Sequence, residues 1–165
     1  MTEATSSFVE RMVGATFLSV DTFEEVEHDQ NATGQAAMVV AIVAVARGIG
    51  ASGSGLMAAS LAAVGALVIW GVWAGICYLV GVHIFGGNAT WGELLRTLGF
   101  AQAPGILWIF AFIPILGWPL YALLPLWVAV AGFIAIRQAL DIGNIKTVLT
   151  ILVGLGVSGF LERLL

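Results

Sequence analysis

Long runs of apolar residues, separated by short polar segments, dominate the pattern along this chain. A transmembrane helix needs about 20 predominantly apolar residues. The apolar runs cover roughly residues 36–46, 56–83, 100–116, 120–136 and 148–160. We therefore predict an all-α fold, a polytopic membrane helix bundle of about five transmembrane helices.

The first apolar run is short for a span, and two interpretations remain open. Arg47 follows the run, and its long side chain would snorkel to the far interface. Alternatively, the helix begins earlier, at Ala32 and Thr33, and is packed inside the bundle. Further along, Pro104 and Pro114 are expected to kink the third span. The sequence GWP at 117–119 is expected to form a tight turn before the fourth span.

Residues 1–20 form a separate segment in this interpretation, and residues 21–165 form the transmembrane domain. Two sets of apolar residues in the segment recur near helical spacing, namely Phe8, Met12, Ala15 and Leu18, and Val9, Val13 and Phe17. This spacing is typical of a short amphipathic helix lying on the membrane surface. A loosely ordered terminus is the alternative.

The next segment, DTFEEVEHDQ at 21–30, is strongly acidic. Asp21 has Glu24 three positions later, which predicts an N-cap with a reciprocal acceptor. Acidic residues in the first turns of a helix are favoured by the positive end of its dipole. We expect this helix to begin outside the bilayer and to continue, unbroken, into the first span near Gln35.

The acidic residues of this helix divide between two faces, with Glu24, Glu27 and His28 on one and Glu25 and Asp29 on the other. These five residues are the candidate cytoplasmic interaction face. Carboxylates beside an imidazole could also hold a divalent cation. A solvated acidic face, or one paired with basic residues of neighbouring loops, needs no metal. The basic residues available for such pairing are Arg96, Arg137 and Lys146.

The longest polar interlude is IFGGNATWGELLRTLG at 84–99. Gly86 and Gly87 break the preceding helix there. Asn88 or Thr90 can cap the next one, and Glu93 stands at the capping-box spacing from Thr90.

Composition supports a membrane environment. Of the 165 residues 60% are hydrophobic and only 10% are charged, and the mean hydropathy is +1.03. Ordinary soluble domains carry about 25% charged residues. The net charge of −4 argues against a nucleic-acid partner. The single Cys77 cannot form an internal disulfide, and residues 1–35 show no secretory signal pattern.

The distribution of basic residues predicts the orientation. With the N-terminus inside, four basic residues fall on the inner side and two on the outer side, since Lys and Arg counts decide orientation. The inner residues are Arg11, Arg96, Arg137 and Lys146, and the outer ones are Arg47 and Arg163. We expect a multi-pass protein of the bacterial inner membrane with a cytoplasmic N-terminus and its C-terminus outside.

Two sequence blocks carry a family resemblance, FGGNATWGELLRTLGFAQAP at 85–104 and IRQALDIGNIKT at 136–147. With TFEEVEHDQNATGQAAMVV before the first span, they resemble the bacterial branch of the Yip1 domain family. The resemblance covers about residues 8–163 and implies five membrane helices with a cytoplasmic N-terminus. Eukaryotic members associate with Rab GTPases and with each other in vesicle traffic. This chain lacks their long N-terminal region, so no Rab partner is expected, and the family implies no catalytic residues.

Other candidate residues lie within or near the spans. Small residues at helical spacing favour close helix packing, and the candidates are Gly71, Gly75, Gly154 and Ser158. His83 and Gln102 form a candidate polar membrane site. His83 could relay protons or cap the interface, and Gln102 could satisfy carbonyls freed by Pro104.

No spacing of residues indicates catalysis, a metal site or a cofactor. The first functional hypothesis is therefore a non-enzymatic membrane scaffold or accessory subunit, acting through helix–helix and cytoplasmic-face contacts. Its expected partners are membrane lipids and other membrane subunits or copies of itself. A small transporter or channel, or a lipid-handling protein, is the alternative. A third hypothesis is a lipid-modifying enzyme with a cluster of His83, Glu27 and Asp29.

Overall fold

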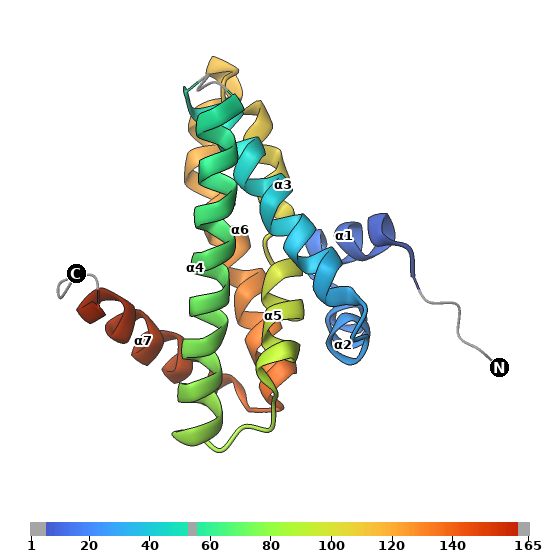
Figure 1. Cartoon of the computed structure of the whole chain (residues 1–165), viewed down its shortest axis with the longest axis vertical. Coiled ribbons are helices and arrows are strands. Elements are labelled where there is room, and N and C mark those ends of the chain that lie inside the picture. The colour runs from blue at the N-terminus through green and yellow to red at the C-terminus, as the bar shows by residue number, and fades with distance from the viewer. Residues whose placement is uncertain (1–5, 53–55, 162–165) are drawn as a thin grey trace.

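Helices make up the computed structural model, which describes residues 6–52 and 56–161 (Figure 1). Within these ranges there are seven α-helices, one 3-10 helix and no strand. They are α1 (Phe8–Thr16), α2 (Val20–His28), α3 (Ala32–Ser52), α4 (Leu56–His83), α5 (Trp91–Phe100), η1 (Ala103–Phe110), α6 (Pro114–Leu140) and α7 (Asn144–Leu161). The predicted all-α helix bundle is confirmed.

The long helices lie side by side along the long axis of the molecule (Figure 1). Three stretches of the described residues are long and apolar enough to cross a membrane: Ala32–Ile49, Ser60–His83 and Pro114–Leu140. The apolar stretch of α7, residues 144–159, is shorter, and α7 runs obliquely away from the lower part of the bundle. Exposed apolar side chains on α4 and α6, such as Leu61, Val68 and Leu126, suit contact with lipid tails.

The predicted third span is not one helix. α5 ends at Phe100, and the chain continues as the 3-10 helix η1, which has Pro104 in its first turn. Proline has no backbone N–H, so it is tolerated at the start of a helix and breaks one that is already running. The stretch 100–116 expected as a single span is thus divided between the end of α5, η1 and the first turn of α6.

The expected turn at 117–119 is also wrong, because these residues lie inside α6. Pro114 begins α6 with no side-chain cap, and the helix passes through Pro119 and Pro125 to Leu140. The break in the chain comes earlier, at Ile113, whose backbone is extended (φ −80°, ψ 117°). Proline at the first position of a helix is pre-organised for it, which places the start of the helix at Pro114.

The acidic helix and the first span are separate helices, contrary to the prediction of one continuous helix. Asp29 ends α2 with an extended backbone (φ −84°, ψ 100°), and its Oδ1 accepts a hydrogen bond from the Asn31 amide at 2.9 Å. Its carbonyl accepts from the amide of Ala32, where α3 begins. A side chain that binds the backbone two residues later favours a turn over a helix.

The N-cap of α2 is Ser19, not Asp21 as predicted. The Ser19 hydroxyl accepts a weak hydrogen bond of 3.4 Å from the amide of Thr22. Leu18, directly before it, has a left-handed backbone (φ 62°) that reverses the chain between α1 and α2. Asp21 lies in the first turn of α2, where it still benefits from the helix dipole.

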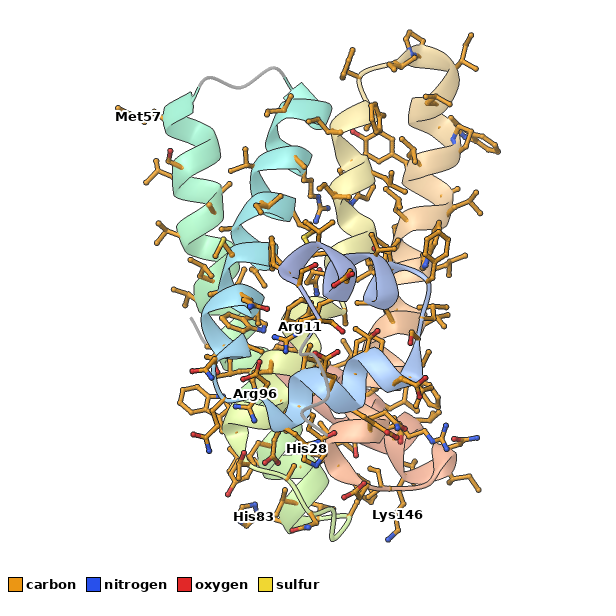
Figure 2. The ribbon with its side chains drawn as sticks, turned by 90° about the vertical axis from the view of Figure 1, so that its right-hand side faces the viewer. Arg11, His28, Met57, His83, Arg96 and Lys146 are labelled. Carbon is orange, nitrogen blue, oxygen red and sulfur yellow. The ribbon has the colours of Figure 1, made fainter. Side chains whose placement is uncertain are left out.

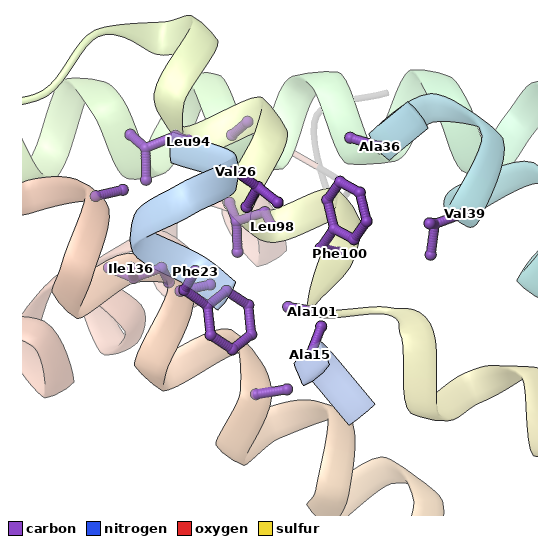
Figure 3. Close-up of a cluster of buried hydrophobic side chains, with 14 of the residues drawn as sticks. Ala15, Phe23, Val26, Ala36, Val39, Leu94, Leu98, Phe100, Ala101 and Ile136 are labelled. Atoms are coloured by element: carbon purple, nitrogen blue, oxygen red, sulfur yellow. The ribbon is translucent and has the colours of Figure 1, made fainter. Parts of the chain in front are cut away.

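A core of buried side chains joins the first two helices to the bundle (Figure 3). Phe23 and Val26 of α2 pack among residues of α5 and α6, including Leu94, Leu98 and Ile136. All five side chains are at most 3% exposed. Burying apolar side chains of this size contributes about 1.5–3 kcal/mol each, so α2 is an integral part of the fold.

Close helix packing depends on two glycines of the α5–η1 segment. A Cβ on Gly99 would lie 2.6 Å from the Cβ of Ala36 on α3. A Cβ on Gly105 would lie 2.6 Å from a methyl group of Val43, two turns further along α3. α3 therefore approaches α5 and η1 more closely than any residue with a side chain at these positions would allow.

Candidate functional site: the acidic surface

Arg11 of α1 binds two acids of the acidic segment 21–30. Its side chain is 1% exposed, and its Nη2 lies 2.9 Å from Oε1 of Glu25 and 2.7 Å from Oδ2 of Asp29. Its Nη1 donates to Oε1 of Gln35 at 2.9 Å. Glu25 and Asp29 do share one face of α2, as predicted, and that face meets Arg11. The guanidinium therefore links α1, α2 and α3.

The contacts with Arg11 lower the pKa values of Glu25 and Asp29. The Arg11 hydrogen bond lowers the pKa of Asp29 below its ordinary value. Burial opposes ionisation of Glu25, but hydrogen bonds from Ser6 and Arg11 outweigh it and lower the pKa of Glu25 as well. Both carboxylates are therefore charged partners of a buried cation and are not free to bind another one.

Arg96 of α5 holds the end of α2 in place. Its side chain is buried, and its Nε donates to the carbonyls of Val26 and Glu27, each at 3.0 Å. Its Nη2 donates to the Glu27 carbonyl as well. The last carbonyls of a helix have no partner within the helix, and here a guanidinium supplies it (Figure 2).

A group of charged side chains gathers on the other face of α2, and we name it the acidic surface. It consists of Glu24, Glu27 and His28 of α2, Glu93 of α5 and Asp141 directly after α6. The sequence predicted the shared face of the first three residues but did not place Glu93 or Asp141 beside them. Their proximity depends on how α5 and α6 pack, which the pattern of one helix does not encode.

Glu27 is the most perturbed acid of this surface. It is 8% exposed, and burial together with the charges of Asp141, Glu93 and Glu24 raises its pKa to about 7. His28 is exposed, and its Nδ1 lies 2.8 Å from the Glu24 carbonyl. This hydrogen bond and the nearby carboxylates raise the pKa of His28. Negative charge is therefore concentrated here beyond what the local side chains neutralise.

Two of the three basic residues considered as partners for the acids bind backbone carbonyls, and Arg137 is exposed. Arg96 binds backbone carbonyls, and Lys146 donates from Nζ to the Phe85 carbonyl at 3.0 Å. Among the described residues, the ion pairs are those of Arg11 with Glu25 and Asp29. Oε1 of Glu24 accepts a hydrogen bond from the side-chain amide of Gln138 at 2.9 Å. The alternative in which the acids pair with Arg96, Arg137 and Lys146 is therefore not formed among the described residues.

In the part of the chain described, no three His, Cys, Asp or Glu side chains lie close enough to hold a metal ion together. The cluster of His83, Glu27 and Asp29 considered from the sequence is thus not assembled there. His83 is exposed at the end of α4 and packs edge-on against Tyr78, with ring centroids 5.6 Å apart. Gln102 lies apart from His83, half-buried in the wall of a cavity between α3, α4, η1 and α6.

The predicted packing glycines have different surroundings. Cβ atoms on Gly71 or Gly75 would meet no other helix closely, and the nearest atom to Gly75 is Nε1 of Trp91 at 3.8 Å. A Cβ on Gly154 would lie 3.2 Å from Trp73, at the contact between α7 and α4. Ser158 is half-buried one turn further along α7. Packing through Gly71 and Gly75 stays a prediction, for contacts outside this chain.

The capping prediction for α5 is confirmed. The amide of Thr90 donates to Oε2 of Glu93 at 2.8 Å, and the amide of Glu93 donates to the Thr90 hydroxyl at 3.2 Å. A second capping box, formed by Ser7 and Glu10 at the start of α1, was missed. The spacing is the same in both cases, so the sequence did carry this signal.

Arg11 is the central residue that sequence reasoning missed. It was counted only as a positive charge that sets orientation. It lies three residues after Phe8 and four residues before Ala15. This spacing places it on the same, apolar face of α1 as these two residues. A charged residue on a buried face needs charged partners, and the next helix is rich in acids.

Comparison with known proteins supports the resemblance found in the sequence. A family profile described as the Yip1 domain matches residues 15–161. No curated protein and no solved structure matches this chain. The match covers nearly all of the bundle, including α2, α5 and the end of α6, which carry the acidic surface.

Proposed function

Since the chain belongs to the Yip1 domain family of membrane proteins, we propose that it is a non-enzymatic scaffold or accessory subunit. Its acidic surface binds a basic segment of another membrane protein or of a second copy. The observation that carries this proposal is the clustering of the carboxylates of Glu24, Glu93 and Asp141 around the buried Glu27. In the described part of the chain these carboxylates have no ion-pair partner.

The acidic surface is preorganised for binding. Arg11 binds Asp29 at the end of α2, and Arg96 binds the carbonyl of Glu27. The helix that carries Glu24 and Glu27 is therefore held in place by both arginines. The amide of Asn88 donates to the carbonyl of Leu140 at 3.0 Å, which ties the loop before α5 to the end of α6. A surface that is rigid before binding loses less conformational entropy when a partner arrives. Clustered charge of one sign also accelerates association with an oppositely charged partner.

The distribution of cations supports a cytoplasmic location for this surface. Arg11, Arg96, Arg137 and Lys146 lie at the same end of the bundle as the acids, and Arg47 lies towards the opposite end of α3. Basic residues favour the cytoplasmic side of a membrane. We therefore place the N-terminus and the acidic surface in the cytoplasm of a bacterial cell. A C-terminus outside the cell would require α7 to cross the inner membrane by itself.

The apolar sides of α4, α6 and α7 would face lipids or the helices of partner subunits. Large exposed apolar residues are distributed over these helices, for example Val72, Leu123 and Leu152. Exposed apolar area of this extent marks membrane or protein contact. The acidic surface then supplies specificity, because charged contacts discriminate between partners more than apolar ones do.

A charge-reversal pair tests the proposal. The protein is purified in mild detergent from its native membrane, and the co-purifying proteins are quantified by mass spectrometry. We expect a recurrent partner with a Lys- or Arg-rich cytoplasmic segment, whose yield falls about tenfold with Glu24→Lys. The control is Asp21→Lys, which makes the same change of charge on the same helix outside the acidic surface. Equal yields from wild type and Glu24→Lys would contradict the proposal, and so would equal losses from both variants.

A further inference from the structure

A cavity of about 780 Å³ lies between α3, α4, η1 and α6, away from the acidic surface. Ligand pockets typically have volumes of about 300–1,000 Å³. Its walls are mostly apolar, with indole rings from Trp70, Trp73 and Trp108 and aliphatic side chains such as Val40 and Val128. The proposed scaffold function makes no use of it.

Small residues keep the cavity open. Ala62 and Ala66 of α4 face Pro125 and Ala129 of α6 across it. α3 packs along α4 on one side and along η1 on the other, whereas α4 and α6 touch each other little. Ile69 of α4 lines the cavity and is 70% exposed. The cavity therefore opens sideways, between α4 and α6, onto the apolar surface that faces lipid.

Arg47 is the charged group of this cavity. It lies five residues before the end of α3, and its guanidinium carbon is 5.4 Å from the ring centroid of Trp108. The side chain is therefore held over the cavity wall by a cation–π contact. The side chain is exposed near the end of the candidate span Ala32–Ile49, so the expectation that it snorkels to the far interface stays a prediction.

Arg47 has no carboxylate partner among the described residues. The helices that line the cavity offer none, because the sequence from Gln30 to Gly92 and from Leu94 to Leu140 contains no Asp or Glu. An arginine within a membrane segment is costly unless it pairs with an anion. Half-buried Gln102 lines the same cavity and adds a side-chain amide to its wall.

We propose that this cavity binds one anionic phospholipid, with an acyl chain between α4 and α6 and the phosphate on Arg47. The apolar walls exclude a soluble anion as the main occupant, because they would gain nothing from it. An acyl chain removes the walls from contact with water. A guanidinium binds phosphate oxygens through two parallel hydrogen bonds. The lateral opening gives the lipid a path from the bilayer.

Native mass spectrometry of the full chain tests this proposal. The probes are dioleoylphosphatidylglycerol, which is anionic, and dioleoylphosphatidylcholine, which has no net charge. We expect wild type to retain one phosphatidylglycerol and to bind phosphatidylcholine much more weakly. Arg47→Gln should weaken phosphatidylglycerol binding about tenfold and leave phosphatidylcholine binding unchanged. Arg137→Gln is the matched control, because Arg137 is an exposed arginine at the other end of the bundle.

A second pair of variants tests the acyl-chain site. Ala66→Phe fills the cavity and should also weaken phosphatidylglycerol binding, whereas Ala122→Phe, on an exposed position of α6 outside the cavity, should not. A melting temperature within a few degrees of wild type confirms that each variant is folded. If Ala66→Phe fails this check, Ala66→Leu replaces it.

Three results would overturn the proposal. The first is equal phosphatidylglycerol binding by wild type and Arg47→Gln. The second is an equal loss with Arg47→Gln and Arg137→Gln, which would indicate diffuse electrostatic attraction. The third is displacement of the lipid by millimolar inorganic phosphate, which would make a soluble anion the ligand. Glu24→Lys should leave lipid binding intact, so failure here and failure of the scaffold function remain distinguishable.

Discussion

Nη2 of Arg11 on α1 lies 2.7 Å from Oδ2 of Asp29, the residue that ends α2. The same nitrogen lies 2.9 Å from Oε1 of Glu25. One buried cation thus fixes two acids of a segment that carries five of the ten Asp and Glu residues of the chain. Glu24 and Glu27, on the other face of α2, have no ion-pair partner among the described residues.

Removing this cation should destabilise the fold. We expect Arg11→Met to reduce the free energy of unfolding by about 2–4 kcal/mol, because it leaves Glu25 and Asp29 unpaired in a partly buried site. Thermal unfolding in detergent, followed by tryptophan fluorescence, measures the effect. Arg137→Met removes an exposed arginine and should change stability little. Similar melting temperatures for the two variants would contradict the structural role of Arg11.

The sequence predicted the helical class well because its apolar runs are long, and a span is recognised by length and composition. It failed where two principles compete. The run from Phe100 to Leu116 is apolar enough for a helix, yet Pro104 and Pro114 each begin a new one. At Asp29 the propensity of the acidic segment suggested continuation, but the side chain binds the next turn and Arg11 instead.

Three of the five residues of the acidic surface were predictable. Helical spacing alone puts Glu24, Glu27 and His28 on one face. Glu93 and Asp141 join them only through the packing of Phe23 and Val26 against α5 and α6, which depends on contacts distant in sequence.

Arg96 should control the local stability of α2. We expect Arg96→Met to increase amide hydrogen exchange in α2 by about tenfold or more, because the carbonyls of Val26 and Glu27 lose their donors. Arg96→Lys, which keeps the charge but not the planar fork, should give an intermediate increase. Exchange in α4 serves as the internal reference. Unchanged exchange in α2 would show that apolar packing alone holds this helix.

Glu27 should make stability depend on pH near neutrality. Its pKa is raised to about 7 in the folded protein, so the Glu27 carboxyl ionises at a lower pH in the unfolded chain than in the folded one. The contribution of neutral Glu27 to the free energy of unfolding is therefore fully present below pH about 4, and it is lost as the pH rises through 7. Glu27→Gln should be more stable than wild type by about 1–3 kcal/mol at pH 8 and should approach it at pH 5. Parallel curves for the two proteins from pH 5 to 8 would contradict the shift.

The close approach of α3 to α5 gives a further prediction. Gly99→Ala should destabilise the protein by about 1–3 kcal/mol, since the new methyl group would meet the backbone and Cβ of Ala36. Gly132→Ala in α6 has open space and should be neutral or slightly stabilising. Melting temperatures of the two variants decide the matter. A stable Gly99→Ala protein would mean that the two helices lie further apart.

The orientation in the membrane is tested by labelling single cysteines in a Cys77→Ala background. Met57 lies at the end of the bundle opposite to His28 and Lys146 (Figure 2), and Ile145 precedes Lys146 in the chain. The side chains of Ile145 and Met57 are both about four-fifths exposed. In intact cells, a membrane-impermeant maleimide should label Met57→Cys and not Ile145→Cys. The opposite pattern would place the acidic surface outside the cell.

The acidic surface as a docking site is tested most directly by a photo-crosslinking amino acid at position 24, with position 118 at the far end as the control. Trp118 is 80% exposed, so a crosslinker there samples the surroundings of the opposite end of the bundle. We predict that irradiation in native membranes links position 24 to a Lys- or Arg-rich peptide of one partner, and that high salt reduces the yield. Position 118 should not link to that peptide. Adducts only with lipid at position 24, or the same peptide linked from both positions, would contradict the account.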